Sequence, residues 1–350
     1  RGCKFHEGVT VTGILQAKGR ATGVVTDHGT IATEVVVNCG GQWARDIGRL
    51  AGGRVPLGSG QHQYVITETV PGVPRELPTL RDPGRLIYFK EEVGGLVFGG
   101  YEPNPIPWAI DGIPDGFVFQ LLPNDFDHFE PLMEQALARV PKLAEAGIKQ
   151  MINGPESFTP DGNFILGEAP ELRNFYVGAG FNAFGIASAG GAGKALAEWV
   201  AAGEPPMDLW PVDIRRFGRP HDSVDWTRTR TLEAYAKHYT MAWPFEEHRS
   251  GRPNRVSPLY ATLKEQGACF GEKLGWERPN WFARPGEKAE DVYTYGRQNW
   301  FDAVGEEHRA VREAAGLFDQ SSFAKFVVKG PDASAAMNWI CANDVDKKVG

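Results

Sequence analysis

The stretch with the most distinctive chemistry is a glycine-rich turn between an apolar run and a small-residue amphipathic run, "NFYVGAGFNAFGIASAGGAGKALAEWV", residues 174–200. A dinucleotide-binding loop needs the spacing G-x-G-x-x-G, but position 183 is Ala. A P-loop needs G-x-x-x-x-G-K-[ST], but Lys194 is followed by Ala195. Neither phosphate template fits. A tight packing turn, in which small residues let two backbones approach, explains the glycines as well as a ligand does.

The ligand interpretation depends on the helix that should follow this turn. The start of a helix presents N–H groups without intrahelical partners and a partial positive charge, which stabilise any anionic group and not phosphate alone. One such group is the pyrimidine end of a flavin ring, which gains negative charge on reduction. We expect the helix from about Ala189. The preceding turn should supply the contacts to the ring, from Gly180, Phe181, Asn182, Ala183, Phe184, Gly185 and Ile186.

A second glycine turn occurs about 140 residues earlier, in "VVVNCGGQWA", residues 35–44. Here an apolar strand-like run ends in Asn-Cys-Gly-Gly and a short helical pattern begins. Alone, this pattern is weak, because glycine also permits an ordinary tight turn. Two strand–turn–helix units are more informative, because one elongated cofactor could touch both. The second turn places Gly40, Gly41 and Trp43 near such a ligand.

Several further elements should position these turns. Short β-rich runs separated by turns occupy Val9 to Cys39, and apolar spacing predicts a short helix through Trp43, Ile47 and Leu50. Strand-like runs follow at Gln63–Thr67, Leu86–Lys90 and Gly95–Gly99. A helix is predicted over Phe129–Ala146, with Leu132, Ala136, Val140 and Leu143 on one face. Near the end, residues 306–319 have a helical pattern, "KFVVKG" (325–330) is strand-like, and residues 336–350 read as a helix and its exit.

Composition excludes two classes of partner. The 350 residues carry a formal net charge of -7, which argues against nucleic acid, because phosphate binding needs clustered Lys and Arg. No apolar run approaches the roughly 18 residues of a membrane span. The four cysteines form no C-x-x-C pair and are predicted to be buried free thiols: Cys3, Cys39, Cys269 and Cys341.

Several longer motifs carry a family resemblance. "VVVNCGGQWARDIG" resembles the N-A-A-G-x-W-A segment of flavin-dependent amine oxidoreductases of the D-amino-acid-oxidase superfamily, and residues 154–200 are similar to their C-terminal flavin-contacting segment. "LGSGQHQYVITE", "HRSGRPNRVSPLY", "GWERPNWF" and "AVREAAGLFDQSSFAKFVVKGPDA" narrow the match to the dimethylglycine dehydrogenase and sarcosine dehydrogenase family. The last of these resembles the start of a folate-binding aminomethyltransferase domain of the glycine-cleavage T-protein type.

The resemblance implies a fold of the α+β class with α/β elements. Residues 1–205 would form a partial FAD-binding oxidoreductase domain with a large antiparallel substrate-domain sheet. Residues 206–265 would form a linking domain, and residues 266–350 the first part of the folate-binding domain. The family's G-x-G-x-x-G loop and a histidine that some members link to FAD would precede Arg1. We therefore expect a fragment that binds FAD weakly by itself.

The resemblance also implies a reaction. A methylated glycine, dimethylglycine or sarcosine, would lose a hydride from its methyl carbon to FAD. The one-carbon unit would be released as formaldehyde or pass to tetrahydrofolate, whose site would lie mostly outside this stretch. Electrons would go to an electron-transfer flavoprotein or to oxygen. No targeting segment is visible, and the family would place the protein in a bacterial cytoplasm or a mitochondrial matrix.

The same resemblance gives the candidate catalytic residues. His62 of "QHQY" and Tyr88 of "LIYFKEE" match positions where the family has side chains facing the flavin, and Val11 joins the expected cofactor contacts. Histidine can relay a proton near neutral pH, and a tyrosine hydroxyl can orient an amine. Without the family, a buried structural histidine and a core aromatic would be the simpler interpretations of His62 and Tyr88.

Two questions stay open at this level. Related sarcosine oxidases have a lysine in the loop after the glycine turn for the substrate carboxylate, but this chain has Ile186 there, which leaves Arg81 and Arg85 as candidates. The family resemblance also extends to a non-catalytic regulatory subunit of pyruvate dehydrogenase phosphatase, and to enzymes that use oxygen directly. His62 and Tyr88 favour an enzyme over the regulatory subunit.

Overall fold

The computed structural model describes residues 2–348 and divides into two units. Of the described residues, the first unit comprises 2–255, Glu272–Gly275 and Asp291–Asn299, and the second comprises Val256–Gly271, Trp276–Glu290 and 300–348. The three-part division at residues 205 and 265 stays a prediction. No helix in residues 2–348 is long and apolar enough to cross a membrane.

The first unit begins with an antiparallel meander, as the β-rich runs predicted. It contains β1 (Val11–Ala17), β2 (Arg20–Thr26) and β3 (Gly29–Ala32), in the order β1-β2-β3. The turn between β2 and β3 is fixed by Asp27, whose Oδ1 accepts a hydrogen bond of 2.9 Å from the backbone N–H of Thr10.

A second, three-stranded sheet joins the two glycine turns. Its order is β11-β12-β4, formed by β11 (Ile165–Glu168), β12 (Phe175–Ala179) and β4 (Val36–Asn38). β12 and β4 run parallel, so the turns that follow both strands leave the same edge of the sheet. After β4 come η1 (Gly41–Trp43) and α1 (Ala44–Leu50), and after β12 comes α3 (Gly185–Ala202). The helix after β12 begins four residues before the predicted Ala189.

The largest sheet has six strands and confirms the predicted antiparallel sheet. Its order is β10-β5-β8-β7-β6, and β9 also pairs with β5. Its strands are β5 (Gly58–Thr67), β6 (Leu80–Asp82), β7 (Ile87–Glu92), β8 (Gly95–Gly100), β9 (Pro107–Trp108) and β10 (Ile148–Phe158).

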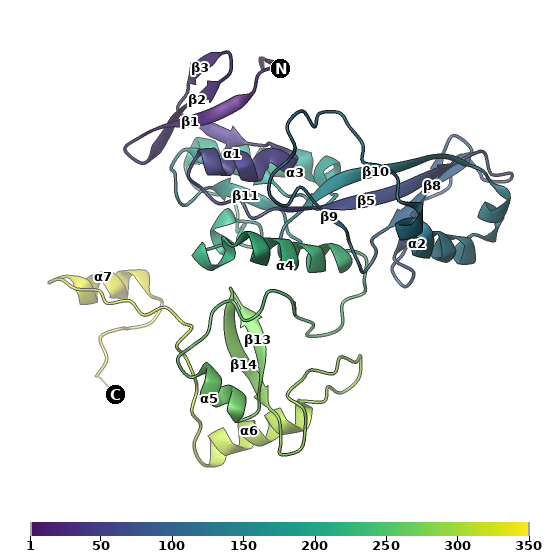
Figure 1. Ribbon diagram of the computed structural model, residues 1–350. Helices are drawn as coiled ribbons and strands as arrows, with labels where there is room; N and C mark the ends of the chain where they lie inside the picture. The colour runs from purple at the N-terminus through teal and green to yellow at the C-terminus, as the bar shows by residue number, and fades with distance from the viewer. Residues whose placement is uncertain (1, 349–350) are drawn as a thin grey trace. The chain divides into compact units, whose positions relative to one another are not determined.

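The two faces of this sheet have different roles. Val65, Phe89 and Phe98 point to one face and pack in a core with Phe129 and Leu132 of α2 (Phe126–Arg139). The other face meets α4 (Val224–Ala236), which runs along the long strands β5 and β10 (Figure 1). Alternation along each strand therefore separates a hydrophobic core from a face on which polar side chains can gather.

The predicted helix over Phe129–Ala146 is wrong at both ends. α2 begins at Phe126, because the Asp125 side chain accepts a hydrogen bond from the backbone N–H of His128 and caps the helix. It ends at Arg139, because the residue before a proline disfavours helical geometry, and Val140 has φ -129° and ψ 80° before Pro141. A separate 3-10 turn, η2 (Pro141–Glu145), follows.

The segment after the first 205 residues is more helical than its sequence pattern predicted. It contains η3 (Ile214–Arg216), η4 (Arg219–His221), α4 and α5 (Tyr260–Glu265). Beyond it, β13 (Ala268–Lys273) and β14 (Trp276–Phe282) form a two-stranded sheet.

Two of the three predictions near the end of the chain hold. The helical pattern of 306–319 corresponds to α6 (Phe301–Glu313), and the predicted final helix to α7 (Ala333–Ile340). Residues 349–350 lie outside the described residues. The strand expected at 325–330 is wrong: the described chain pairs it with no other strand, and Phe326 and Val327 are exposed. A strand forms only where a neighbour completes its hydrogen bonds.

The four cysteines are free thiols, but only part of that prediction holds. Cys269 is buried, whereas Cys3 and Cys39 are exposed and Cys341 is half-buried. Cys39 is exposed because it belongs to the glycine turn after β4, where the chain leaves the sheet.

Candidate active site

His62 and Tyr88 lie together on the sheet face that opposes the α2 core. In the strand register Tyr64 of β5 is opposite Gly99 of β8, and Gly99 is opposite Tyr88 of β7. A side chain at Gly99 would lie 2.7 Å from Tyr88 Oη and 2.8 Å from Tyr64 Cβ. Glycine at this position therefore lets the two tyrosines approach each other across the central strand, next to His62.

Hydrogen bonds fix the orientation of the His62 ring. Tyr235 Oη donates to the carbonyl of Gln61 at 2.9 Å, so its single hydrogen is used there. The contact of 3.3 Å between Tyr235 Oη and His62 Nδ1 then has histidine as the donor. This leaves His62 Nε2 as an acceptor, and it lies 3.2 Å from Tyr88 Oη. A neutral His62 with an accepting Nε2 is the form that can take a proton from a ligand.

The tyrosines around His62 are held in their neutral forms. Burial, followed by the charge of Glu156, raises the pKa of Tyr88 and of Tyr101 far above the usual range. Burial, followed by the charge of Glu102, does the same to the pKa of Tyr235. These hydroxyls therefore act as hydrogen-bond donors and not as charged groups at physiological pH.

Several residues of this cluster could not be found from the motifs. Tyr235, His238 and Tyr239 come from α4 and its exit, more than 170 residues after His62 in the chain. The ring of Tyr101 stacks on His62 with centroids 4.5 Å apart, and it contacts His238 at 4.5 Å and Tyr239 at 4.8 Å. The only sequence signal is the spacing of Tyr235, His238 and Tyr239 at three and four residues, which would predict one face of a helix. In the structure α4 ends at Ala236, and the last two residues lie in the turn that follows.

His238 should make the stability of the first unit depend on pH. Burial, with Arg81 and His62 as smaller causes, lowers the pKa of His238 to about 4. The unfolded chain takes up a proton near its ordinary pKa of about 6.5, but the folded chain does so only near 4, so stability falls as pH drops through this window. We expect thermal unfolding to show a loss of about 1–2 kcal/mol between pH 7 and 4 that His238→Gln removes.

The exposed His6 provides the control for this measurement, since His6→Gln should leave the pH dependence as it is in the wild type. If His238→Gln and the wild type lose stability in parallel from pH 7 to 4, the proposed burial effect at His238 is wrong.

The glycine turns open on an apolar cavity of about 470 Å³. Seven of the predicted flavin contacts line it: Gly41, Gly180, Phe181, Asn182, Ala183, Gly185 and Ile186. Within the described residues no side chain caps the start of α3, so the N–H groups of its first turn are available to a ligand. Apolar walls beside free N–H groups suit a flat aromatic ring that gains negative charge, so the residues present fit the ring of FAD.

The turn before α3 is held in shape by Asn182, which is almost completely buried. Its side chain donates to the carbonyl of Gly180 at 2.7 Å and accepts from the backbone N–H of Thr159 at 2.9 Å. Gly180, Asn182 and Ala183 have φ values of 66°, 49° and 70°. Two non-glycine residues in the left-handed region indicate that this turn keeps a costly conformation, which is a common feature of ligand sites.

The other four predicted contacts do not line this cavity. Val11, the first residue of β1, packs against a core of buried hydrophobic side chains. A side chain added at Gly40 would lie 2.5 Å from Ile47 Cδ1. Trp43 ends η1 and is half-exposed. Phe184 precedes α3 and contacts the His238 ring at 5.2 Å.

Glu156 connects the cavity with the histidine cluster. It lines the cavity and accepts a hydrogen bond of 2.9 Å from Tyr101, whose ring stacks on His62. The two predicted parts of the site, the glycine turn and the His62–Tyr88 pair, are therefore neighbours in the fold.

The structure separates the two candidate arginines. Arg81 is directly opposite Tyr88 in the register of β6 and β7, so both side chains lie on the same face. Its guanidinium lies 3.8 Å from the ring centroid of Tyr239 and donates to the carbonyl of His238 at 2.9 Å. Arg85 instead donates to Gln135 of α2 at 2.7 Å, on the side of the hydrophobic core.

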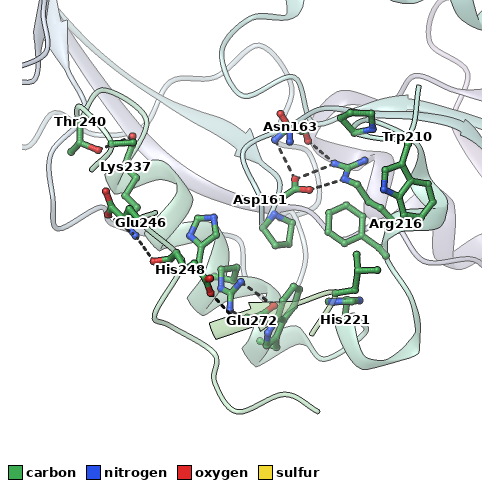
Figure 2. Close-up of a pocket in the computed structure, with 18 residues that line it drawn as sticks. Asp161, Asn163, Trp210, Arg216, His221, Lys237, Thr240, Glu246, His248 and Glu272 are labelled. Atoms are coloured by element: carbon green, nitrogen blue, oxygen red, sulfur yellow. Dashed lines mark hydrogen bonds and ion pairs between the residues drawn. The ribbon is translucent and has the colours of Figure 1, made fainter. Parts of the chain in front are cut away.

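A separate polar cavity of about 520 Å³ is lined by side chains that form ion pairs with one another (Figure 2). Arg216 donates to Asp161 at 2.7 Å and to the carbonyl of Asn163 at 2.8 Å, and Lys237 lies 3.1 Å from Glu246. The Arg216 pair links the segment after α3 to the turn between β10 and β11, the Lys237 pair lies within that segment, and we assign both a structural role. Among residues 2–348, no cluster of three or more His, Cys, Asp or Glu side chains could hold a metal ion.

An antiparallel sheet beside a helix start that opens on an apolar cavity is the arrangement expected of an FAD-linked oxidoreductase. A family model described as FAD dependent oxidoreductase matches residues 1–199, and its central-domain model matches residues 202–257. The chain belongs to this family. A third model, the GCVT N-terminal domain, matches residues 259–350.

Curated relatives are similar over nearly all of this chain. It is 42% identical to 4-methylaminobutanoate oxidase (formaldehyde-forming) of Paenarthrobacter nicotinovorans, and 40% identical to mitochondrial sarcosine dehydrogenase of Mus musculus, matching 99% and 100% of this chain. It is also 37% identical to the mitochondrial pyruvate dehydrogenase phosphatase regulatory subunit of Mus musculus, over 100% of this chain. The matches cover 42%, 41% and 40% of these relatives, so the chain spans about two fifths of their length.

The similarity of this chain to a solved structure shows a shared fold and no more. L-proline dehydrogenase from P. horikoshii matches with a TM-score of 0.50 and 24% identity, over 69% of this chain and 57% of that one.

Proposed function

We propose that this chain forms the substrate side of a flavin-dependent enzyme that oxidises a small N-methylated amino acid, with dimethylglycine and sarcosine as the first candidates. The observation that carries the proposal is the contact of 3.2 Å between His62 Nε2 and Tyr88 Oη next to the glycine-turn cavity. The names of two relatives, 4-methylaminobutanoate oxidase (formaldehyde-forming) and sarcosine dehydrogenase, both indicate an N-methylated amino acid as substrate, which supports the proposal.

The side chains would act mainly on the protonation and position of the substrate. FAD, when bound against the α3 turn, supplies the acceptor of the hydride. An amine gives up a hydride only in its neutral form, and most substrate in solution is protonated. His62 Nε2 can accept that proton, directly or through the Tyr88 hydroxyl, because Tyr88 stays neutral. The rings of Tyr64, Tyr88 and Tyr239 give the methylated nitrogen an aromatic surrounding, which favours an arriving cation.

Arg81 is the proposed partner of the substrate carboxylate. Replacing it by methionine removes one charge-assisted hydrogen-bond partner, worth about 1.5–3 kcal/mol, and should raise KM about 10- to 100-fold. The turnover number should change little, because the carboxylate is bound equally in ground and transition states. Steady-state kinetics of the Arg81→Met holoenzyme would measure both constants.

Arg85→Met is the matched control, because Arg85 lies in the same hairpin but contacts α2. It should keep the KM of the wild type. If both variants raise KM equally, or neither does, Arg81 does not bind the carboxylate.

Anaerobic mixing of the full-length flavoprotein with dimethylglycine or sarcosine tests the function itself. Loss of the oxidised-flavin absorbance is the expected result. Unchanged absorbance with both substrates would contradict the proposal and favour a non-catalytic role like that named for the regulatory subunit. Reoxidation by oxygen or by an electron-transfer flavoprotein then identifies the acceptor, which the proposal leaves between these two.

A role for tetrahydrofolate rests on the match of residues 259–350 to the GCVT N-terminal domain. We propose that the one-carbon unit passes to tetrahydrofolate or leaves as formaldehyde. The mitochondrial matrix or a bacterial cytoplasm remains the predicted compartment.

A further inference from the structure

A chain of polar contacts runs from His62 towards solvent on the side away from Tyr88. Tyr235 Oη lies 3.3 Å from His62 Nδ1 and 3.4 Å from Glu102 Oε2. The other oxygen of Glu102, Oε1, lies 3.1 Å from His128 Nε2. Glu102 follows Tyr101 just after β8, Tyr235 belongs to α4, and His128 to the first turn of α2, so three distant segments build one line of contacts.

Burial along this line changes from one end to the other. His62 and Glu102 are almost completely buried, whereas the His128 side chain is 22% exposed. A buried carboxylate is costly unless its oxygens have partners. Each Glu102 oxygen has one, and the two partners lie on opposite sides: Tyr235 towards the site and His128 towards the surface.

Tyr235 can transmit a proton because it has two acceptors for one hydrogen. Its hydroxyl donates to the carbonyl of Gln61 at 2.9 Å, and the Glu102 carboxylate at 3.4 Å is a second acceptor within reach. Rotation about the C–O bond moves the hydrogen from one to the other without moving the ring. The hydroxyl oxygen then faces His62 Nδ1–H throughout.

We propose that Tyr235, Glu102 and His128 form a proton-release path from His62 to solvent, a proposal that rests on the proposed oxidation of an amine. When Nε2 of His62 gains a proton from the substrate ammonium, its Nδ1 proton passes to Tyr235 Oη, and Tyr235 gives its own hydrogen to Glu102. Glu102 releases a proton to His128, and His128 releases it to water. One proton enters at Nε2 and one leaves at His128, with no change in oxidation state.

Other titratable groups face His62 and could compete for the proton. They are Tyr64 on β5, Tyr88 on β7, Tyr101 after β8, Glu156 on β10, Tyr235 on α4 and His238 after α4. Of these, Glu156 lines the proposed flavin cavity, so a proton there would stay beside the cofactor. His238 resists protonation, because burial lowers its pKa to about 4. The path through Glu102 reaches the surface without crossing the cavity.

Proton release by the full-length holoenzyme tests this path. The enzyme is mixed anaerobically with sarcosine or dimethylglycine in weak buffer, and a pH indicator follows proton release while the flavin absorbance follows reduction. We expect Glu102→Gln and Tyr235→Phe to slow proton release at least about tenfold, since neither amide nor phenyl can accept and pass on the proton. In His128→Ala, which opens a partly exposed position, added imidazole should restore the rate.

Matched controls separate a relay from loss of packing. Glu130 lies on the exposed side of α2, and Tyr176 is a buried tyrosine of β12. The variants Glu130→Gln and Tyr176→Phe should both release protons at the wild-type rate. Wild-type rates in Glu102→Gln and Tyr235→Phe overturn the relay, and so does a slow His128→Ala that imidazole does not restore. If the wild-type flavin is not reduced at all, the proposed function fails, and the relay fails with it.

Discussion

Replacement of His62 by asparagine is expected to slow anaerobic flavin reduction about 10²- to 10³-fold, the usual contribution of a positioned acid–base group. Asparagine can still donate to Tyr235 Oη in place of Nδ1–H, so the surrounding contacts are largely kept. It cannot accept a full proton, so the substrate amine would stay charged. Stopped-flow absorbance of the full-length holoenzyme, mixed with sarcosine or dimethylglycine, measures this rate.

Two other variants make this result specific. Tyr88→Phe removes the hydroxyl that donates to His62 Nε2 and should slow reduction by a smaller factor, about tenfold. His28→Asn, at an exposed turn, should leave the rate unchanged. Flavin reduction by His62→Asn within threefold of the wild-type rate would show that His62 only fills space in the sheet.

The pH dependence of flavin reduction should not come from the three buried tyrosines of the site or from His238. Because the pKa of Tyr88, Tyr101 and Tyr235 lies far above the usual range, none of these hydroxyls ionises below pH 10. His238 is neutral above about pH 5, because burial lowers its pKa to about 4. A group that titrates near neutral pH in the rate of flavin reduction would therefore not be one of these four.

Local patterns predicted most of the elements that position this site. The strands β5, β7 and β8 and the turn before α3 follow from alternation and glycine spacing, which depend on a few neighbouring residues. His62 and Tyr88 were identified because each belongs to a motif along such a strand. The approach of Tyr88 to Tyr64, beside His62, depends on Gly99, which the pattern of β8 alone did not indicate.

Most of what the sequence did not predict depends on contacts between distant segments. Tyr235 of α4 contacts His62, and no motif near either residue predicts this contact. The segment 325–330 has the composition of a strand, but a strand also needs an adjacent partner, and the described residues supply none. The end of α2 was missed for a local reason, because the helical spacing of Val140 and Leu143 outweighed the signal of Pro141.

The glycine turn can be tested by two substitutions with opposite expected effects. Gly180 has φ 66°, and an added Cβ would lie 2.5 Å from Leu57 Cδ2 and 2.7 Å from Thr159 Cγ2. Gly180→Ala should therefore destabilise the folded chain by about 2–4 kcal/mol, from backbone strain and overpacking together. Its thermal unfolding temperature should fall with or without FAD.

Gly185→Val should have little effect on the fold and a large effect on the cofactor. An added Cβ at Gly185 would approach only Phe181, at 3.6 Å, and the backbone there has ordinary helical geometry, so stability without FAD should change by less than about 0.5 kcal/mol. The branched side chain would instead enter the cavity in front of the α3 N–H groups. FAD titration of the full-length protein, followed by flavin fluorescence, should show a Kd raised at least about tenfold, or about 1.4 kcal/mol.

Ala197→Val, at an exposed position three turns further along α3, is the control and should keep both the unfolding temperature and the Kd for FAD. An unchanged Kd in Gly185→Val would mean that the start of α3 does not face the flavin ring. The glycines would then serve only to pack α3 against β12. A lowered unfolding temperature of the FAD-free Gly185→Val protein would contradict the space seen beside Gly185. Gly180 and Gly185 therefore distinguish the two interpretations of the turn: the first glycine is needed for the chain to fold, and the second for what the folded chain binds.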